Sequence, residues 1–265
     1  MKKLESKVAV VYGDGSVGGE IAKAFAQEGA RVFLTGRTLT KLNAIADDIS
    51  STEGGGVIDI AKLDALDEKA VEEHMSEIIK TAGQIDISFN AIGIAQKGIQ
   101  GIPLTELSLE SFSHPINIYT QSHFVTTKAA ARHMVKQGCG VIIMHTPNAS
   151  RLSPPFVGGM VPAWAAMEAL CRSLSVECGQ HGVRAVCLHT TAIPETPLID
   201  EVFEIHGKSH GVTFEQFQSV MEGMTHRKRL TTIEELTNAA VFVASDEGSA
   251  ITGTILNLTA GMIVE

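Results

Sequence analysis

Cysteine, positive charge and aromatic rings are all scarce in this chain of 265 residues, and each shortage narrows what the protein can be. Its four cysteines form no C-x-x-C pair, so we expect free thiols in a reducing compartment rather than a disulfide scaffold. The net charge of −9 argues against nucleic acid or an anionic membrane as the main partner. His145 and His189, which end two expected strands, have no H-x-x-x-H or similar spacing, so we predict no metal site.

Long apolar runs are also missing. The first residues, MKKLESKVAVVY, contain one short apolar run, which is too short for a secretory signal or a membrane span. We therefore expect a cytoplasmic protein. The length and the 44% apolar content favour one large globular domain over residues 1–265.

Short apolar runs alternate with longer helical patterns, which is typical of βαβ units and a parallel sheet. The sequence therefore predicts an α/β fold, a single doubly wound Rossmann domain. Strands are expected at 7–12, 31–35, 57–63, 85–90, 140–145, 183–189 and 254–258, and helices at 20–27, 41–50, 68–81, 115–137, 162–179 and 233–245. Two stretches read as irregular, 150–161 and 194–229, and both follow strand ends on the side where such folds bind ligands. We predict that they form an active-site loop and a mobile substrate loop.

A glycine-rich turn follows the first expected strand. The segment 13–19 reads GDGSVGG and contains G-x-G-x-x-G between a strand and a helix. Such a turn brings a pyrophosphate close to the free N–H groups of the helix. The acid Asp14 opposes anion binding unless it is turned away or caps the helix. The turn predicts a dinucleotide site with Gly13, Gly15, Ser16, Val17 and Gly18.

Several further segments extend this pattern along the chain. They are TGR at 35–37, NAIG at 90–93, PAWAAMEALCRSL at 162–174 and AITGTILNL at 250–258. Together they resemble the short-chain dehydrogenase/reductase family over almost the whole chain. The resemblance implies cofactor contacts from Asp64, Ala65, Asn90, Ala91, Gly93, Trp164 and Thr196. Arg37 can pair with a 2′-phosphate, so we expect NADP(H) in preference to NAD(H).

The same resemblance makes the catalytic positions unusual. The family carries Tyr-x-x-x-Lys on the helix near 162–179, and in this register Met160 and Trp164 take those two positions. Neither side chain can act as the usual proton donor, and a lost acid costs about 10²–10⁴ in rate. Asn117 and Thr146 fall at or near the positions of the family's other catalytic residues. His145 ends a strand near the expected nicotinamide pocket and could replace the missing acid.

We therefore predict an NADP(H)-binding oxidoreductase that acts on a small carbonyl or alcohol with a non-standard proton donor. Two alternatives stay open: a non-redox enzyme such as a dehydratase, isomerase or cyclase, and a catalytically silent binding subunit. The family resemblance also implies a homo-oligomer, a tetramer or dimer that packs through the helix carrying Trp164.

Overall fold

A computed structural model of the protein describes residues 2–52 and 54–264. Within these residues the chain forms one sheet of seven strands in the order β3-β2-β1-β4-β5-β6-β7. Every neighbouring pair is parallel, so all strands end at the same edge of the sheet. The strands are β1 (Val8–Tyr12), β2 (Arg31–Gly36), β3 (Ile58–Lys62), β4 (Ile87–Asn90), β5 (Gly140–Pro147), β6 (Val183–Thr190) and β7 (Thr254–Leu258). The expected doubly wound α/β fold is thus confirmed.

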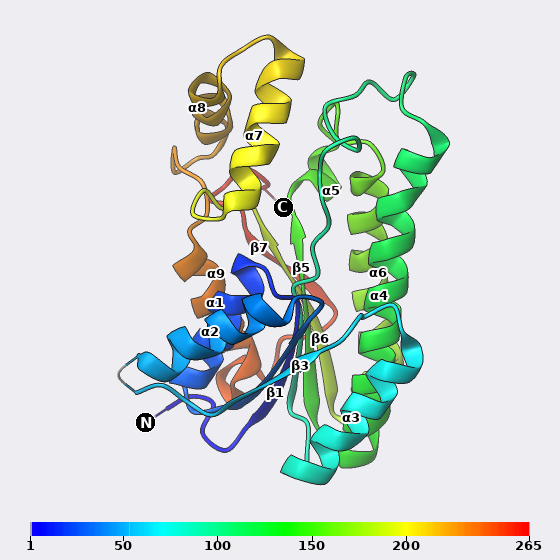
Figure 1. The fold of residues 1–265 in the computed structure, drawn as a ribbon, viewed down its shortest axis with the longest axis vertical. Coiled ribbons are helices and arrows are strands. Elements are labelled where there is room, and N and C mark those ends of the chain that lie inside the picture. The colour runs from blue at the N-terminus through cyan, green and yellow to red at the C-terminus, as the bar shows by residue number, and fades with distance from the viewer. Residues whose placement is uncertain (1, 53, 265) are drawn as a thin grey trace.

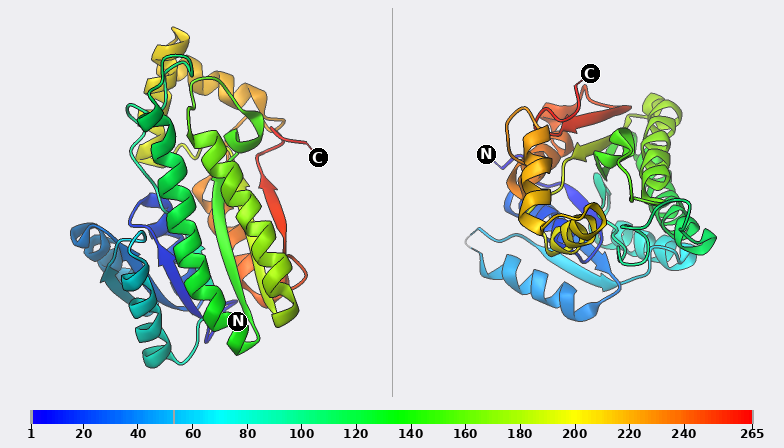
Figure 2. Two further views of the ribbon diagram at one scale, coloured as in Figure 1. Left: turned by 90° about the vertical axis from the view of Figure 1, so that its right-hand side faces the viewer. Right: turned by 90° about the horizontal axis from the view of Figure 1, so that it is seen from above.

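Helices cover both faces of this sheet (Figures 1 and 2). One layer contains α1 (Ser16–Gln27), α2 (Leu39–Ser51) and α9 (Ile233–Ala244). The other contains α3 (Glu68–Ala82), α4 (Leu109–Gln137) and α6 (Met160–Cys178). Strand β1 shows why both layers are needed: all five of its residues are buried, and alternate residues belong to the two different cores.

Two expectations about helices were wrong. The long helix α4 begins at Leu109, because Ser108 caps its N-terminus through a hydrogen bond from the Ser111 backbone N–H. Pro115 therefore lies inside the helix, although proline is typical of a first turn.

The stretch 194–229, expected to be irregular, contains two helices. They are α7 (Pro197–His210), with proline in its first turn, and α8 (Phe214–Met224), with a complete capping box from Thr213 and Gln216. A short helix, α5 (Ala149–Leu152), also interrupts the stretch 150–161. Helices α7 and α8 lie above the carboxyl edge of the sheet (Figure 1). Among the described residues, no helix is both long and apolar enough to cross a membrane.

Candidate functional site

The glycine-rich turn joins β1 to α1 with no spare space at two of its glycines. A Cβ on Gly18 would lie 2.1 Å from the Gly13 carbonyl oxygen, and one on Gly13 would lie 2.3 Å from the Ala91 oxygen. Gly13 also has a φ of +130°, which favours glycine. Gly15, in contrast, faces open space and precedes α1 without a side-chain cap among the described residues. The first turn of α1 can therefore present N–H groups to an anion, so the loop fits a dinucleotide phosphate.

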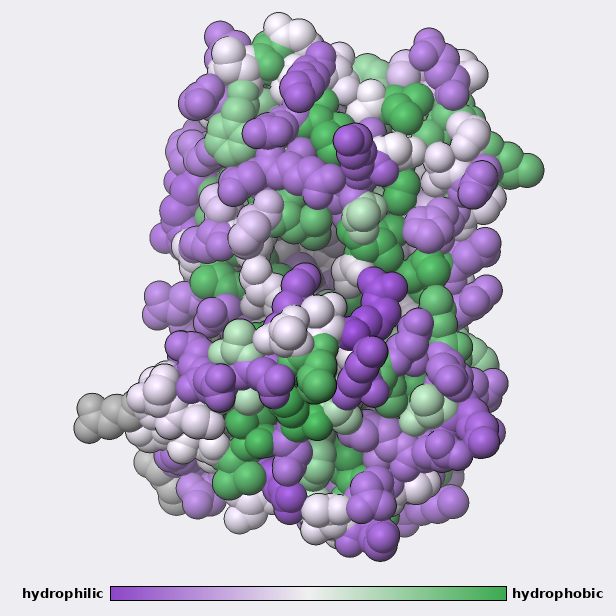
Figure 3. All heavy atoms as spheres, in the orientation of Figure 1, coloured by the Kyte–Doolittle hydropathy of each residue, from purple (hydrophilic) through white to green (hydrophobic). Residues whose placement is uncertain are grey.

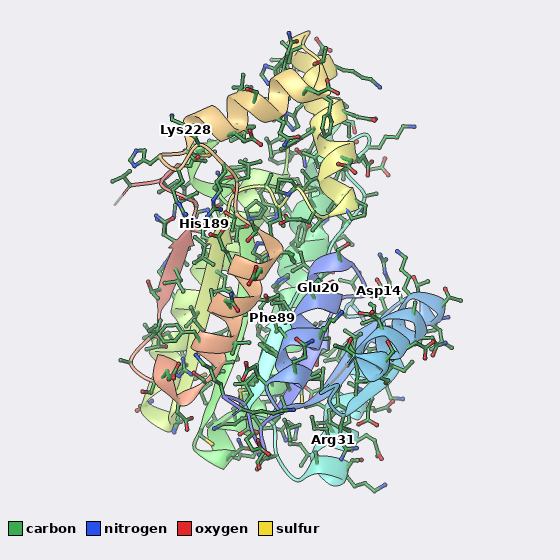
Figure 4. The ribbon with its side chains drawn as sticks, turned by 90° about the vertical axis from the view of Figure 1, so that its left-hand side faces the viewer. Asp14, Glu20, Arg31, Phe89, His189 and Lys228 are labelled. Atoms are coloured by element: carbon green, nitrogen blue, oxygen red, sulfur yellow. The ribbon has the colours of Figure 1, made fainter. Side chains whose placement is uncertain are left out.

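Asp14 is turned away from the first turn of α1. Its carboxylate accepts a hydrogen bond of 2.8 Å from the Thr38 backbone N–H at the start of α2. A Cβ on Gly36 would lie 2.5 Å from the Asp14 side chain, so this glycine makes room for the acid at the end of β2 (Figure 4). The acid that could oppose phosphate binding is thus held beside the loop that carries Arg37.

The other residues expected at the cofactor site lie along the same edge. Arg37 is exposed after β2. Asp64 is exposed, and its carboxylate accepts from the Leu66 backbone N–H, which is a local turn contact. Asn90 is buried and donates a hydrogen bond of 3.0 Å to Thr126, so it ties β4 to α4. Thr196 is buried and donates to the Ile193 carbonyl at 2.8 Å.

Helix α6 begins in an apolar and aromatic cluster. Met160 is its first residue and is fully buried, and Trp164 follows one turn later with 7% exposure. The helix contains neither tyrosine nor lysine. Met160 and Trp164 therefore pack in one cluster, together with Ile99, Tyr119, Val157, Ala163 and Met167.

Tyr119 on α4 meets Trp164 across this cluster. Their ring centroids are 6.5 Å apart, and the Trp164 indole and the Ile94 backbone N–H both act on the pKa of the phenol. Burial raises the pKa of Tyr119 to about 12, although the two donors act in the opposite direction. The family motifs quoted above do not include this tyrosine. Its place in the inward series Tyr119, Ser122, His123 and Thr126 is the sequence signal that could have identified it.

Two of the expected catalytic residues lie elsewhere. Asn117 is exposed on α4, two residues before Tyr119, and two positions on a helix point in nearly opposite directions. Thr146 has no exposed surface because β5 runs on to Pro147, and its hydroxyl lies 3.2 Å from the Cys187 sulfur and 3.4 Å from a Glu168 oxygen. Neither residue belongs to the cluster around Trp164, and their catalytic roles stay predictions.

His145 lies on β5 and contacts a residue of β6. Its Nε2 lies 2.8 Å from the Thr190 hydroxyl. Burial, with a smaller effect of His189, lowers the pKa of His145 to about 4. The imidazole is therefore neutral near pH 7, and the role of His145 as the replacement acid stays a prediction.

A polar cluster around Glu168 on α6, which the sequence did not indicate, lies beside β5 and β6. Glu168 is 5% exposed, accepts a hydrogen bond of 2.5 Å from the Ser150 hydroxyl and pairs with Arg151 at 3.5 Å. The His189 Nε2 lies 3.4 Å from the same hydroxyl (Figure 4). Burial lowers the pKa of His189. This cluster fastens α5 to α6, and it went unnoticed because Ser150 and Glu168 are 18 residues apart.

A chain of side-chain hydrogen bonds joins α7 to the loop after β4. His206 on α7 donates to Gln100 at 2.8 Å, Gln100 donates to Gln96 at 2.5 Å, and Gln96 donates to the Ile94 carbonyl at 2.5 Å. Burial, followed by the effect of His210, lowers the pKa of His206 to about 4. The molecular surface is hollowed just below α7 (Figure 3). These hydrogen bonds therefore tie α7 to the loop that follows β4.

Comparison with known proteins identifies the class to which this fold and glycine turn belong. A family model described as enoyl-(acyl carrier protein) reductase matches residues 11–263. The chain therefore belongs to this family of short-chain dehydrogenases/reductases, as the resemblance had indicated.

Three similar proteins illustrate the relationship. The chain is 28% identical to an uncharacterized oxidoreductase of Bacillus subtilis over 264 residues, which covers 99% of this chain and 93% of that one. It is 29% identical to a (+)-cis,trans-nepetalactol synthase of Nepeta racemosa over 265 residues, with coverage of 99% and 93%. The crystal structure of sorbitol-6-phosphate 2-dehydrogenase from Erwinia amylovora shares the fold, with a TM-score of 0.89, 24% identity and coverage of 97% and 100%.

Proposed function

We propose that the protein is a nicotinamide-dinucleotide oxidoreductase that interconverts a small carbonyl compound and its alcohol with a non-standard proton donor. The observation that carries the proposal is the open glycine turn before α1, where Gly15 leaves room for a phosphate. The bound dinucleotide would supply the hydride. The chain's own residues would bind it, exclude water beneath α7 and transfer the proton.

The dinucleotide would be held along the edge formed by β1, β2 and β4. The glycine turn would receive the pyrophosphate, and Thr196 at the start of α7 would lie by the nicotinamide amide. Asp64, Ala65, Asn90, Ala91 and Gly93 would line the adenosine side. Trp164 would lie by the nicotinamide.

We propose NADP(H) as the preferred dinucleotide because Arg37 is exposed and can pair with a 2′-phosphate. Asp14 acts against this preference, since its carboxylate is held at the Thr38 N–H in the same loop. Arg37→Ala should weaken NADPH binding at least tenfold and change NADH binding little. Asp14→Asn should strengthen NADPH binding.

Titration of NADPH and NADH against tryptophan fluorescence tests the proposal directly, because Trp164 is the single tryptophan. Quenching or energy transfer, stronger with NADPH at equal concentration, is the expected result. A folded protein that gives no signal at millimolar dinucleotide would refute the proposed function. Oxidation and reduction of a panel of small alcohols and ketones then test turnover.

A second test concerns the degenerate catalytic pair. Met160→Tyr combined with Trp164→Lys restores the family's side chains at the start of α6. The double variant should reduce ketones faster than the wild type if only the proton donor differs. A folded double variant without any gain would mean that the pocket itself has diverged.

One relative favours a second candidate function. The relative from Nepeta racemosa is named a synthase, and the cluster around Met160 and Trp164 offers an apolar, aromatic surface of the kind that could hold a reactive organic substrate. On this alternative the protein is a non-redox enzyme, such as a cyclase. Substrate conversion without net consumption of dinucleotide would distinguish it.

The proposal also covers the oligomeric state of the protein and its cellular compartment. We propose a homo-oligomer formed through α4 and α6, whose large exposed apolar side chains include Phe124 and Val176. The four cysteines are free, in keeping with a reducing cytoplasm.

A further inference from the structure

We propose that Tyr119 on α4 supplies the proton-transferring hydroxyl of this site, in place of a residue on α6. The inference rests on the proposed oxidoreductase function and names the group that performs its acid–base step. The chain has two tyrosines, and Tyr119 is the one whose hydroxyl meets Trp164. The phenol thus stands next to the residue that resemblance places at the lysine position.

Burial opposes loss of the Tyr119 proton, and two N–H groups act against this effect. These groups are the Trp164 indole and the Ile94 backbone N–H, which belongs to the loop after β4, and both act to lower the pKa of the phenol. Donors aimed at an oxygen stabilise the negative charge that develops when its proton leaves. Both donors are neutral, so they replace the ammonium group of a lysine by two dipoles.

The step balances without any further reactant. In the reduction, the bound dinucleotide would supply a hydride to the substrate's carbonyl carbon, and the C=O π pair would move to the oxygen. That oxygen takes the proton from Tyr119, whose O–H bond breaks to leave a phenolate. A solvent proton then restores the phenol, and oxidation of the alcohol runs through the same steps in reverse.

Two loops enclose Tyr119, and both contain a glycine in the left-handed region. Ile99 packs on the cluster next to Gly98 (φ +80°), and Val157 packs on it next to Gly158 (φ +60°). The Tyr119 ring keeps 6% exposure. A displacement of these loops about their glycines would open the phenol to a substrate beneath α7.

Tyr119→Phe is the decisive variant, and Tyr12→Phe is its matched control. Tyr12 is also a buried phenol, but its oxygen has no hydrogen-bond partner among the described residues. Tyr119→Phe should lower kcat by about 10²–10⁴ and leave the dinucleotide Kd, measured by equilibrium dialysis, within about twofold. Tyr12→Phe should keep the wild-type kcat. A Tyr119→Phe enzyme with the wild-type kcat would overturn the role of Tyr119 and leave the oxidoreductase function intact.

The pH profile gives an independent readout if Tyr119→Phe fails to fold. The phenolate is the base in alcohol oxidation, and with a pKa of about 12 its fraction rises tenfold per pH unit between pH 7 and 10. Trp164 and the Ile94 backbone do not titrate, and His123, whose ring centroid lies 6.1 Å away, has a pKa lowered to about 4 by burial. The oxidation rate should therefore rise log-linearly with pH, while the reduction rate stays flat.

The outcomes separate the two proposals. An oxidation plateau below pH 9 would overturn the assignment to Tyr119. Trp164→Phe should slow the reaction about tenfold, since it removes one hydrogen bond worth roughly 1.4 kcal/mol. A wild-type protein that binds no dinucleotide and turns over no alcohol or ketone would instead refute the oxidoreductase function on which the assignment rests.

Discussion

Acidification should destabilise this protein through histidines that are buried in their neutral form. His123 on α4 is 1% exposed and His206 on α7 is 5% exposed, and burial lowers the pKa of each to about 4. The unfolded chain binds these protons near the ordinary pKa of about 6.5. Between pH 6.5 and 4 the unfolded state therefore holds more protons, so stability falls as the pH falls through this window.

The magnitude follows from the two pKa values. At pH 5, an imidazole with a pKa of about 6.5 unfolded and about 4 folded costs roughly 2 kcal/mol. His123 and His206 together therefore cost about 4 kcal/mol, and His145 acts in the same direction. The loss is a large part of the 5–15 kcal/mol of a typical domain.

Urea unfolding at pH 7.5 and pH 5, followed by Trp164 fluorescence and circular dichroism, measures this loss. His206→Gln preserves a donor to Gln100 and should remove about 2 kcal/mol of the difference between the two pH values. The exposed His181→Gln is the matched control and should leave the difference unchanged. Equal unfolding free energies at both pH values, or the full wild-type difference in His206→Gln, would refute the reasoning.

Two further predictions concern single buried positions. Gly18→Ala places a Cβ against the Gly13 backbone oxygen and should abolish dinucleotide binding or lower the melting temperature markedly. Gly223→Ala, on the open face of α8, is the control and should be neutral or stabilise the protein by up to about 1 kcal/mol. Equal melting temperatures and dinucleotide affinities for both variants would contradict this prediction. Glu168→Gln removes the charge that pairs with Arg151 and should cost about 2 kcal/mol in urea unfolding; an unchanged midpoint would show that the carboxylate is not needed.

The sheet could be predicted from the sequence because its strands are short apolar runs between turn residues. The expected strand 254–258 matches β7, and the expected 31–35 differs from β2 by one residue. Helices α7 and α8 escaped prediction because their apolar residues are mixed with histidine, lysine and glutamine. Their packing depends on Phe203, His206 and Phe217, which make ring contacts that no local pattern encodes.

The glycine turn could be predicted because its constraint is local: a backbone contact selects glycine at fixed spacing. The proposed pairing of Tyr119 with Trp164 could not, because these two residues are 45 positions apart in the chain. Alignment by motif pointed to Asn117, whereas the helical face that packs inward carries Tyr119. The choice between them depends on the rotation of α4, which a linear comparison does not specify.

Under the proposed role of Tyr119, the hydrogen-bonded row from His206 to Ile94 links α7 to the catalytic hydroxyl. The Ile94 carbonyl accepts a hydrogen bond from Gln96, and the Ile94 N–H acts on the Tyr119 phenol. The same residue therefore interacts with both the row and the tyrosine. Any movement of α7 that pulls on this row re-aims a donor at the phenol. Substitutions on α7 and α8, far from the reacting atoms, should therefore change kcat more than they change ligand affinity.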